Sequence, residues 1–203
     1  MSQKPVKPLR LLGSVPNKVY RRLIVRYPFQ TDQDYAYSYR FAARRLAATF
    51  KGEPVDDLML LPFLTLYRQA FELELKNLIR FLVNTRMTYI EGVTLELEQA
   101  ISEERFKVLG HNLYKLLNEA KKHYDILKLH EPFPADVETL VRMLHEADGS
   151  GTAFRYAGQL PEVQEYADFP DLAALLDQQY DNLAVITDYV EGRYSEGPPI
   201  GEF

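Results

Sequence analysis

The stretch from Leu58 to Val83 constrains the fold most, because apolar residues return there at helical spacing through almost every turn. Its apolar residues occupy two rows of a helix, and together these rows are far wider than the single stripe of a surface helix. The members of the two rows are Phe63, Leu64, Leu66, Ala70, Phe71, Leu73, Leu75, Leu78 and Leu82. The spacing therefore predicts a central, largely buried helix.

One row of this helix is fully polar and carries Arg68, Glu72, Lys76 and Arg80. These residues are spaced i, i+4, so Glu72 can pair with Arg68 on one side and with Lys76 on the other. Each such pair contributes roughly 0.2 to 0.5 kcal/mol when it is exposed. The row is either a solvated edge of the helix or part of a functional site.

The rest of the chain predicts four more helices, over about 32–50, 112–131, 136–147 and 170–192. Between the central helix and the helix over 112–131, apolar and polar residues alternate over 88–97, which suggests a short strand. Residues 102–109 suggest a further helical segment. We expect an all-α fold, a helical bundle of about five helices with an irregular basic N-terminal arm and a long loop before the last helix. The expected domains are an arm over 1–31, a helical domain over 32–194 and a disordered tail over 195–203.

The chain has 203 residues, 46% of them hydrophobic and 26% charged, which is typical of a globular domain. It contains no cysteine, so disulfides, thiolate metal sites and cysteine nucleophiles are excluded. No apolar run is long enough to span a bilayer. We therefore expect a cytoplasmic protein that does not interact with a membrane.

Charge is distributed unevenly along the chain. Residues 1–51 contain eleven lysines and arginines but only two acidic residues, whereas the whole chain has a net charge of −5. Such an asymmetry indicates either a basic arm that meets an anionic partner, RNA or an acidic protein, or an arm that lies on its own acidic body.

Standard catalytic and metal-binding motifs are absent from the sequence. The four histidines form no HExxH pair and have no accompanying carboxylate cluster, so no metal site is expected. Neither a glycine-rich phosphate loop nor a GxSxG elbow is present. We expect no cofactor.

Three segments carry a family resemblance: LPFLTLYRQAFELELKNLI at 61–79, GHNLYKLLNEA at 110–120 and AFRY at 153–156. Together they resemble small bacterial proteins of the HEPN-like superfamily. The resemblance implies a helical bundle, a homodimer and a role in a toxin–antitoxin or phage-defence system. In catalytic members, an arginine followed four to six residues later by a histidine forms a metal-independent ribonuclease site.

The resemblance implies two candidate sites. The first pairs Arg105 with His111, as the catalytic arginine and histidine of such a ribonuclease. In the second, the matching segments converge, so that Glu72 and Lys76 meet His111 and Arg155. An alternative needs no ligand: Arg155 pairs with Glu72 and His111 caps its helix.

The leading expectation is a HEPN-like protein that acts by binding RNA or a protein partner without catalysis. If RNA is bound, the arginines of the arm and of the next helix are the expected phosphate contacts, namely Arg21, Arg22, Arg26, Arg44 and Arg45. The alternatives are a metal-independent ribonuclease and a structural subunit without affinity for nucleic acid.

Overall fold

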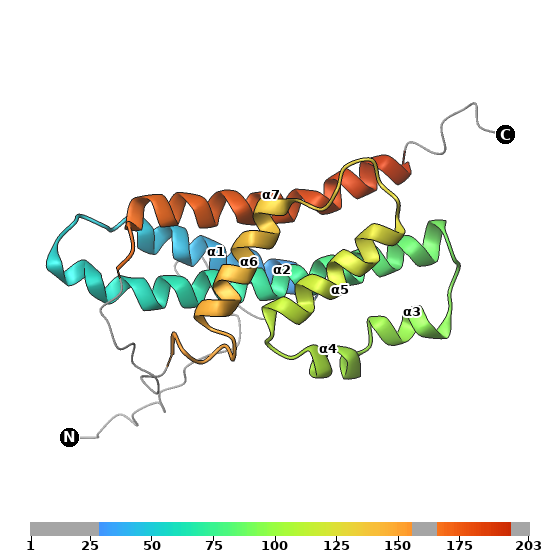
Figure 1. The fold of residues 1–203 in the computed structure, drawn as a ribbon, viewed down its shortest axis with the longest axis horizontal. Coiled ribbons are helices and arrows are strands. Elements are labelled where there is room, and N and C mark those ends of the chain that lie inside the picture. Colours follow the sequence, from blue (N-terminus) through green and yellow to red (C-terminus); the bar gives the residue numbers. More distant parts are fainter. Residues whose placement is uncertain (1–28, 156–165, 196–203) are drawn as a thin grey trace, which may run out of the picture. The chain divides into compact units, whose positions relative to one another are not determined.

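The computed structural model describes residues 29–155 and 166–195. The chain divides between Gln30 and Thr31 into two units, and every helix given below belongs to the second. Over the described ranges the structure has seven α-helices, one 3-10 helix and no strand (Figure 1). The all-α class is confirmed. The predictions for Arg21, Arg22 and Arg26, and for residues 196–203 of the tail, lie outside the described residues.

Five helices are long, in agreement with the expected bundle: α1 (Asp32–Ala47), α2 (Leu60–Tyr89), α5 (Leu113–Ile126), α6 (Ala135–Ala147) and α7 (Phe169–Ser195). Three short elements lie between them: η1 (Pro54–Met59), α3 (Leu95–Ala100) and α4 (Glu103–Leu109). The suggestion of a strand over 88–97 is wrong. Those residues form the end of α2, a turn and the start of α3, whose first turn is capped by the side chain of Thr94.

Helix α2 is the centre of the bundle and contacts α1, α5 and α7 along its length (Figure 1). Apolar residues on several sides of this helix are completely buried, including Phe63, Phe71, Leu75, Leu78 and Leu82. Burial of a large apolar side chain contributes about 1.5 to 3 kcal/mol. The predicted central helix is therefore confirmed, and its packing holds α1, α5 and α7 in place.

The spacing along α1 predicts that Arg40 shares a basic face with Arg44 and Arg45, but in the structure its side chain joins α1 to α7. Its side chain is buried, with Nε 2.7 Å from Oδ1 of Asp177 and a terminal nitrogen 2.7 Å from Asp181. The Tyr67 hydroxyl of α2 donates a hydrogen bond to the same Asp177 oxygen at 3.1 Å. The arginine is buried because two carboxylates of α7 neutralise it.

Glu74 is a second buried carboxylate in the bundle, and it faces α7. The sequence pattern predicts that it receives a hydrogen bond from a tyrosine or an arginine, or that it opens onto a cavity. In the structure the Tyr180 hydroxyl donates to Oε2 at 3.1 Å, and the Asn77 amide donates to Oε1 at 3.2 Å. Burial raises the pKa of Glu74, and these two hydrogen bonds offset the effect only in part.

The pKa of Glu74 is higher in the folded protein than in the unfolded chain. Protonation of Glu74 therefore stabilises the fold at a pH below the unfolded-state pKa, and this stability is lost as the pH rises through the folded-state pKa. Glu74→Gln should therefore raise the free energy of unfolding at pH 8, by roughly 1 kcal/mol or more. The gain should shrink towards pH 4.5. Thermal unfolding at both pH values measures it, with Glu98→Gln on exposed α3 as the control. A loss of stability at pH 8 would contradict this account.

Candidate functional site

The polar row of α2 forms the centre of a buried network. The predicted i, i+4 pairs are both present: Glu72 Oε2 lies 3.3 Å from Arg68 Nη1, and Glu72 Oε1 lies 2.8 Å from Lys76 Nζ. Of the two interpretations of this row, a solvated edge is wrong, because the side chains of Glu72 and Arg68 are only 1% and 5% exposed. Charges buried in this way have to be satisfied by partners from other elements.

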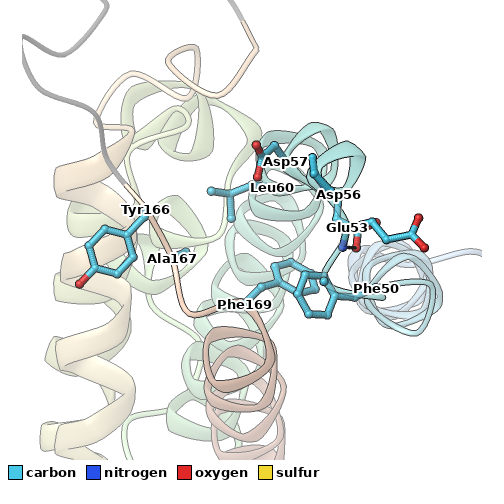
Figure 2. Close-up of a pocket in the computed structure, with 10 residues that line it drawn as sticks. Phe50, Glu53, Asp56, Asp57, Leu60, Tyr166, Ala167 and Phe169 are labelled. Carbon is cyan, nitrogen blue, oxygen red and sulfur yellow. Dashed lines mark hydrogen bonds between the residues drawn. The ribbon is translucent and has the colours of Figure 1, made fainter.

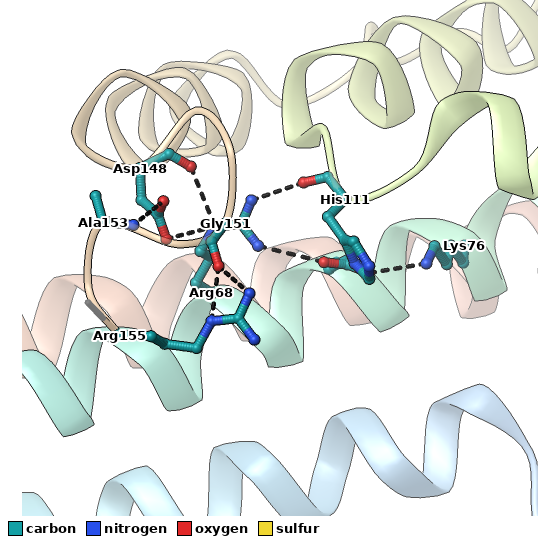
Figure 3. A network of polar contacts seen from close by, with 8 residues as sticks. Arg68, Lys76, His111, Asp148, Gly151, Ala153 and Arg155 are labelled. Atoms are coloured by element: carbon teal, nitrogen blue, oxygen red, sulfur yellow. Dashed lines mark hydrogen bonds and ion pairs between the residues drawn. The ribbon is translucent and has the colours of Figure 1, made fainter. Parts of the chain in front are cut away.

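His111, between α4 and α5, supplies one of these partners (Figure 3). Its Nδ1 lies 2.8 Å from Glu72 Oε1, and its main-chain carbonyl accepts a hydrogen bond of 2.6 Å from Arg68 Nη2. The imidazole itself is 67% exposed. His111 does not cap α5, since the side chain of Asn112 accepts the hydrogen bond from the Lys115 amide.

The charge state of Glu72 determines how the imidazole is oriented. Burial by itself would raise the pKa of Glu72, but the hydrogen bonds and charges of Lys76 and His111 outweigh burial and hold that pKa below its usual range. An ionised carboxylate accepts hydrogen bonds and cannot donate them, so His111 Nδ1 must carry a proton. In the neutral imidazole this leaves Nε2 as a proton acceptor on an exposed ring.

The loop after α6 contacts the other end of the network. The carboxylate of Asp148 lies 3.2 Å from Arg68 Nε and accepts the Ala153 amide at 2.8 Å. Arg155 Nε donates to the Gly151 carbonyl at 2.7 Å. Figure 3 shows Gly151 beside the Arg68 guanidinium, and a Cβ at this glycine would lie 3.0 Å from guanidinium atoms. Arg68 is thus bound to α2 itself, to the His111 loop and to the loop after α6.

A pocket of about 370 Å³ opens beside His111, and it is lined by Lys76, Glu103, Phe106, Lys107, Gly110 and His111. Two lysines therefore lie close to the exposed imidazole. Lys76 is largely buried and held by Glu72, whereas Lys107 is exposed on α4. The pocket combines a proton acceptor with cationic groups, a combination suited to an anionic ligand such as a phosphodiester.

Of the residues predicted to form a site, the structure brings Lys76 and His111 into direct contact with Glu72, whereas Arg155 contacts the carbonyl of Gly151, beside Arg68. Arg155 does not pair with Glu72 as the ligand-free alternative expected, because Arg68 forms the ion pair with that carboxylate. Arg68 and Asp148 also belong to the network, although neither was among the predicted site residues. The signal for Arg68 was its place in the polar row. No local signal indicated that Asp148, in a loop containing glycines, is buried.

Arg105 lies in a different cluster from His111. Its Nη2 is 2.6 Å from Glu119 Oε2, and Glu119 also lies beside the buried His123 on α5. Arg86 of α2 contacts His123 Nδ1 at 2.5 Å. The predicted pairing of Arg105 with His111 therefore has no contact that supports it in the described structure.

A larger pocket of about 680 Å³ lies between η1 and the start of α7 (Figure 2). Its walls combine the rings of Phe50 and Phe169, whose centroids are 5.0 Å apart, with the carboxylates of Glu53, Asp56 and Asp57. Hydrogen bonds from the backbone amides of residues 51 and 53 lower the pKa of Asp56. Because of these carboxylates, the pocket does not suit a polyanion.

Gly151 and Gly52 allow a test of the close contact with Arg68, because both have a backbone φ near +75° but no atom lies within 4 Å of a Cβ at Gly52. Both alanine variants should be destabilised by the backbone conformation. Gly151→Ala should lose roughly 1 to 3 kcal/mol more, since the Arg68 guanidinium is fixed by three partners and cannot yield. Urea unfolding measures the difference. Equal losses would show that Arg68 moves freely.

In the part of the chain that the structure describes, no group of three or more histidine, cysteine, aspartate or glutamate side chains is placed to hold a metal ion. No helix among the described residues is long and apolar enough to cross a membrane. No family model, no curated protein and no solved structure matches the chain.

Proposed function

We propose that the protein is a HEPN-like, non-catalytic module of a defence or toxin–antitoxin type system, and that it binds RNA at the pocket beside His111. The observation that carries the proposal is the exposed imidazole of His111, held by the buried Glu72 and flanked by Lys76 and Lys107. The three segments that carry the family resemblance also contribute to this network, through Arg68, His111 and the Ala153 amide. We also propose that the protein forms a homodimer.

The charges around the pocket support a phosphate ligand. The buried part of the network is balanced, because Arg68 and Lys76 face Glu72 and Asp148. At the pocket wall, Lys107 adds an exposed positive charge, and the carboxylate of Glu103 lies 3.7 Å from the guanidinium of Arg80. A phosphate that enters can contact Lys107 without breaking the buried pairs. Binding of this kind releases counterions and weakens as salt rises.

A second candidate function is metal-independent cleavage of RNA, and the contact between His111 Nδ1 and Glu72 favours it. With Nδ1 protonated, Nε2 of the neutral ring can take the proton of a ribose 2′-hydroxyl. The resulting alkoxide then attacks the adjacent phosphorus to form a 2′,3′-cyclic phosphate, and the departing 5′-oxygen takes the proton from His111 Nε2. Lys76 and Lys107 would stabilise the charge of the five-coordinate intermediate. Arg105 has no part in this arrangement.

The test incubates the full chain with mixed tRNA and ribosomal RNA, with EDTA, at two salt concentrations. We expect a mobility shift that weakens with salt, and no cleavage. Lys107→Ala should reduce the affinity and lower the slope of log K against log salt by roughly 0.7, the value for one contact with single-stranded phosphate. Lys128→Ala, an exposed lysine outside the pocket, is the matched control and should change neither.

Three other outcomes would revise the proposal. Cleavage that persists in EDTA and disappears in His111→Ala would establish the ribonuclease instead. A mobility shift unaffected by Lys107→Ala would move the binding surface away from the pocket. If neither a mobility shift nor cleavage occurs, the RNA proposal fails, and a structural subunit that docks on an acidic protein is the remaining interpretation.

A further inference from the structure

The outer face of α1 carries an exposed stripe of aromatic and cationic side chains. It consists of Tyr37, Phe41, Arg44 and Arg45, spaced i, i+4, i+7 and i+8, so all four lie on one side of the helix. The rings of Tyr37 and Phe41 are 60% and 51% exposed. We call these four residues the α1 stripe.

The packing of the bundle does not explain the α1 stripe. The adjacent side of α1 carries the buried residues Ala36, Arg40 and Ala43, and it faces α2 and α7. Single exposed apolar residues are common on protein surfaces. Two aromatic rings one turn apart, next to two arginines, form a more specific pattern.

The arginines of the α1 stripe are not neutralised in the way that Arg40 is. Arg44 is 60% exposed, and its Nε lies 3.6 Å from Asp177, whose carboxylate is already held by Arg40 at 2.7 Å. Arg45 places its guanidinium 5.4 Å from the centre of the Phe41 ring. Both cations therefore remain available to an anionic ligand while one of them lies over an aromatic face.

We infer that the α1 stripe binds single-stranded RNA, with the rings of Tyr37 and Phe41 stacked on unpaired bases and Arg44 and Arg45 in contact with phosphates. Aromatic rings beside cations are the usual means of binding single strands without sequence preference. Duplex RNA does not fit, because its base faces are already covered by stacking. This inference rests on the proposed function and names the form of RNA that is bound.

A second copy of the chain suits the α1 stripe less well. In a two-fold symmetric interface the same patch lies on both subunits, so a stripe centred on itself would bring four guanidinium groups together. Repulsion between like charges disfavours that arrangement, whereas it favours a polyanion.

The absence of tryptophan from the chain allows a direct test. In Tyr37→Trp the new indole is the only tryptophan, and stacking on a base should quench its emission. We expect quenching when a single-stranded oligouridylate is added, and none with a duplex RNA of equal length. As a control, Val185→Trp places the indole at an exposed position on α7, and its emission should change with neither RNA.

Affinity measurements with the same single strand complete the test. Tyr37→Ala and Phe41→Ala should each weaken binding about fivefold or more, while Val185→Ala leaves it unchanged. If wild-type protein binds no RNA, the proposed function fails together with this inference. If Lys107→Ala weakens RNA binding but the two aromatic variants do not, only this inference is overturned. It is likewise overturned if Phe41→Ala converts a dimer to a monomer, by light scattering, without loss of RNA affinity.

Discussion

A carboxylate buried in the middle of a long helix stays ionised only with cations around it, and Glu72 has Arg68 and Lys76 one turn away on either side. This requirement organises the elements around the site. Arg68 has donors left after pairing with Glu72, and they reach the His111 carbonyl and Asp148. The loop before α5 and the loop after α6 are thereby held against the same helix. Removal of Glu72 would leave two cations without their shared partner, which is far more costly than the loss of a surface ion pair.

The two buried glutamates of α2 show how different surroundings give one residue type two roles. Glu72 contacts cationic neighbours and the exposed imidazole of His111. Its ionised form is therefore stabilised, and it orients that imidazole beside the pocket. Glu74, two residues later, faces α7, and the groups that donate hydrogen bonds to it, on Tyr180 and Asn77, are both neutral. They do not compensate for burial, so the pKa of Glu74 is raised. The first carboxylate orients a candidate functional group, and the second belongs to the interior of the bundle.

Two pockets of the helical domain differ in the charged residues that line them. The pocket at η1 is bordered by Glu53, Asp56 and Asp57, and the pocket beside His111 contains Lys76 and Lys107. Of these two pockets, only the latter is lined by lysines. A ligand at His111 meets an imidazole that is already oriented, because Glu72 fixes Nδ1 before anything binds. Preorganisation of this kind lowers the cost of binding and also suits acid–base chemistry.

The sequence by itself determined the five long helices, because their periodicity is a local signal. The central helix and the i, i+4 pairs of Glu72 both follow from spacing along the chain. The family resemblance also indicated that Glu72, Lys76 and His111 belong together. The sequence could not show that the polar row is buried, since burial depends on which helices pack against it. Arg40 and Asp148 illustrate this limit. Each is buried against an oppositely charged residue more than 75 positions away in the chain: Arg40 against Asp177, and Asp148 against Arg68. Only the tertiary structure decided these pairings, because an ion pair between distant segments has no periodic signature in the chain.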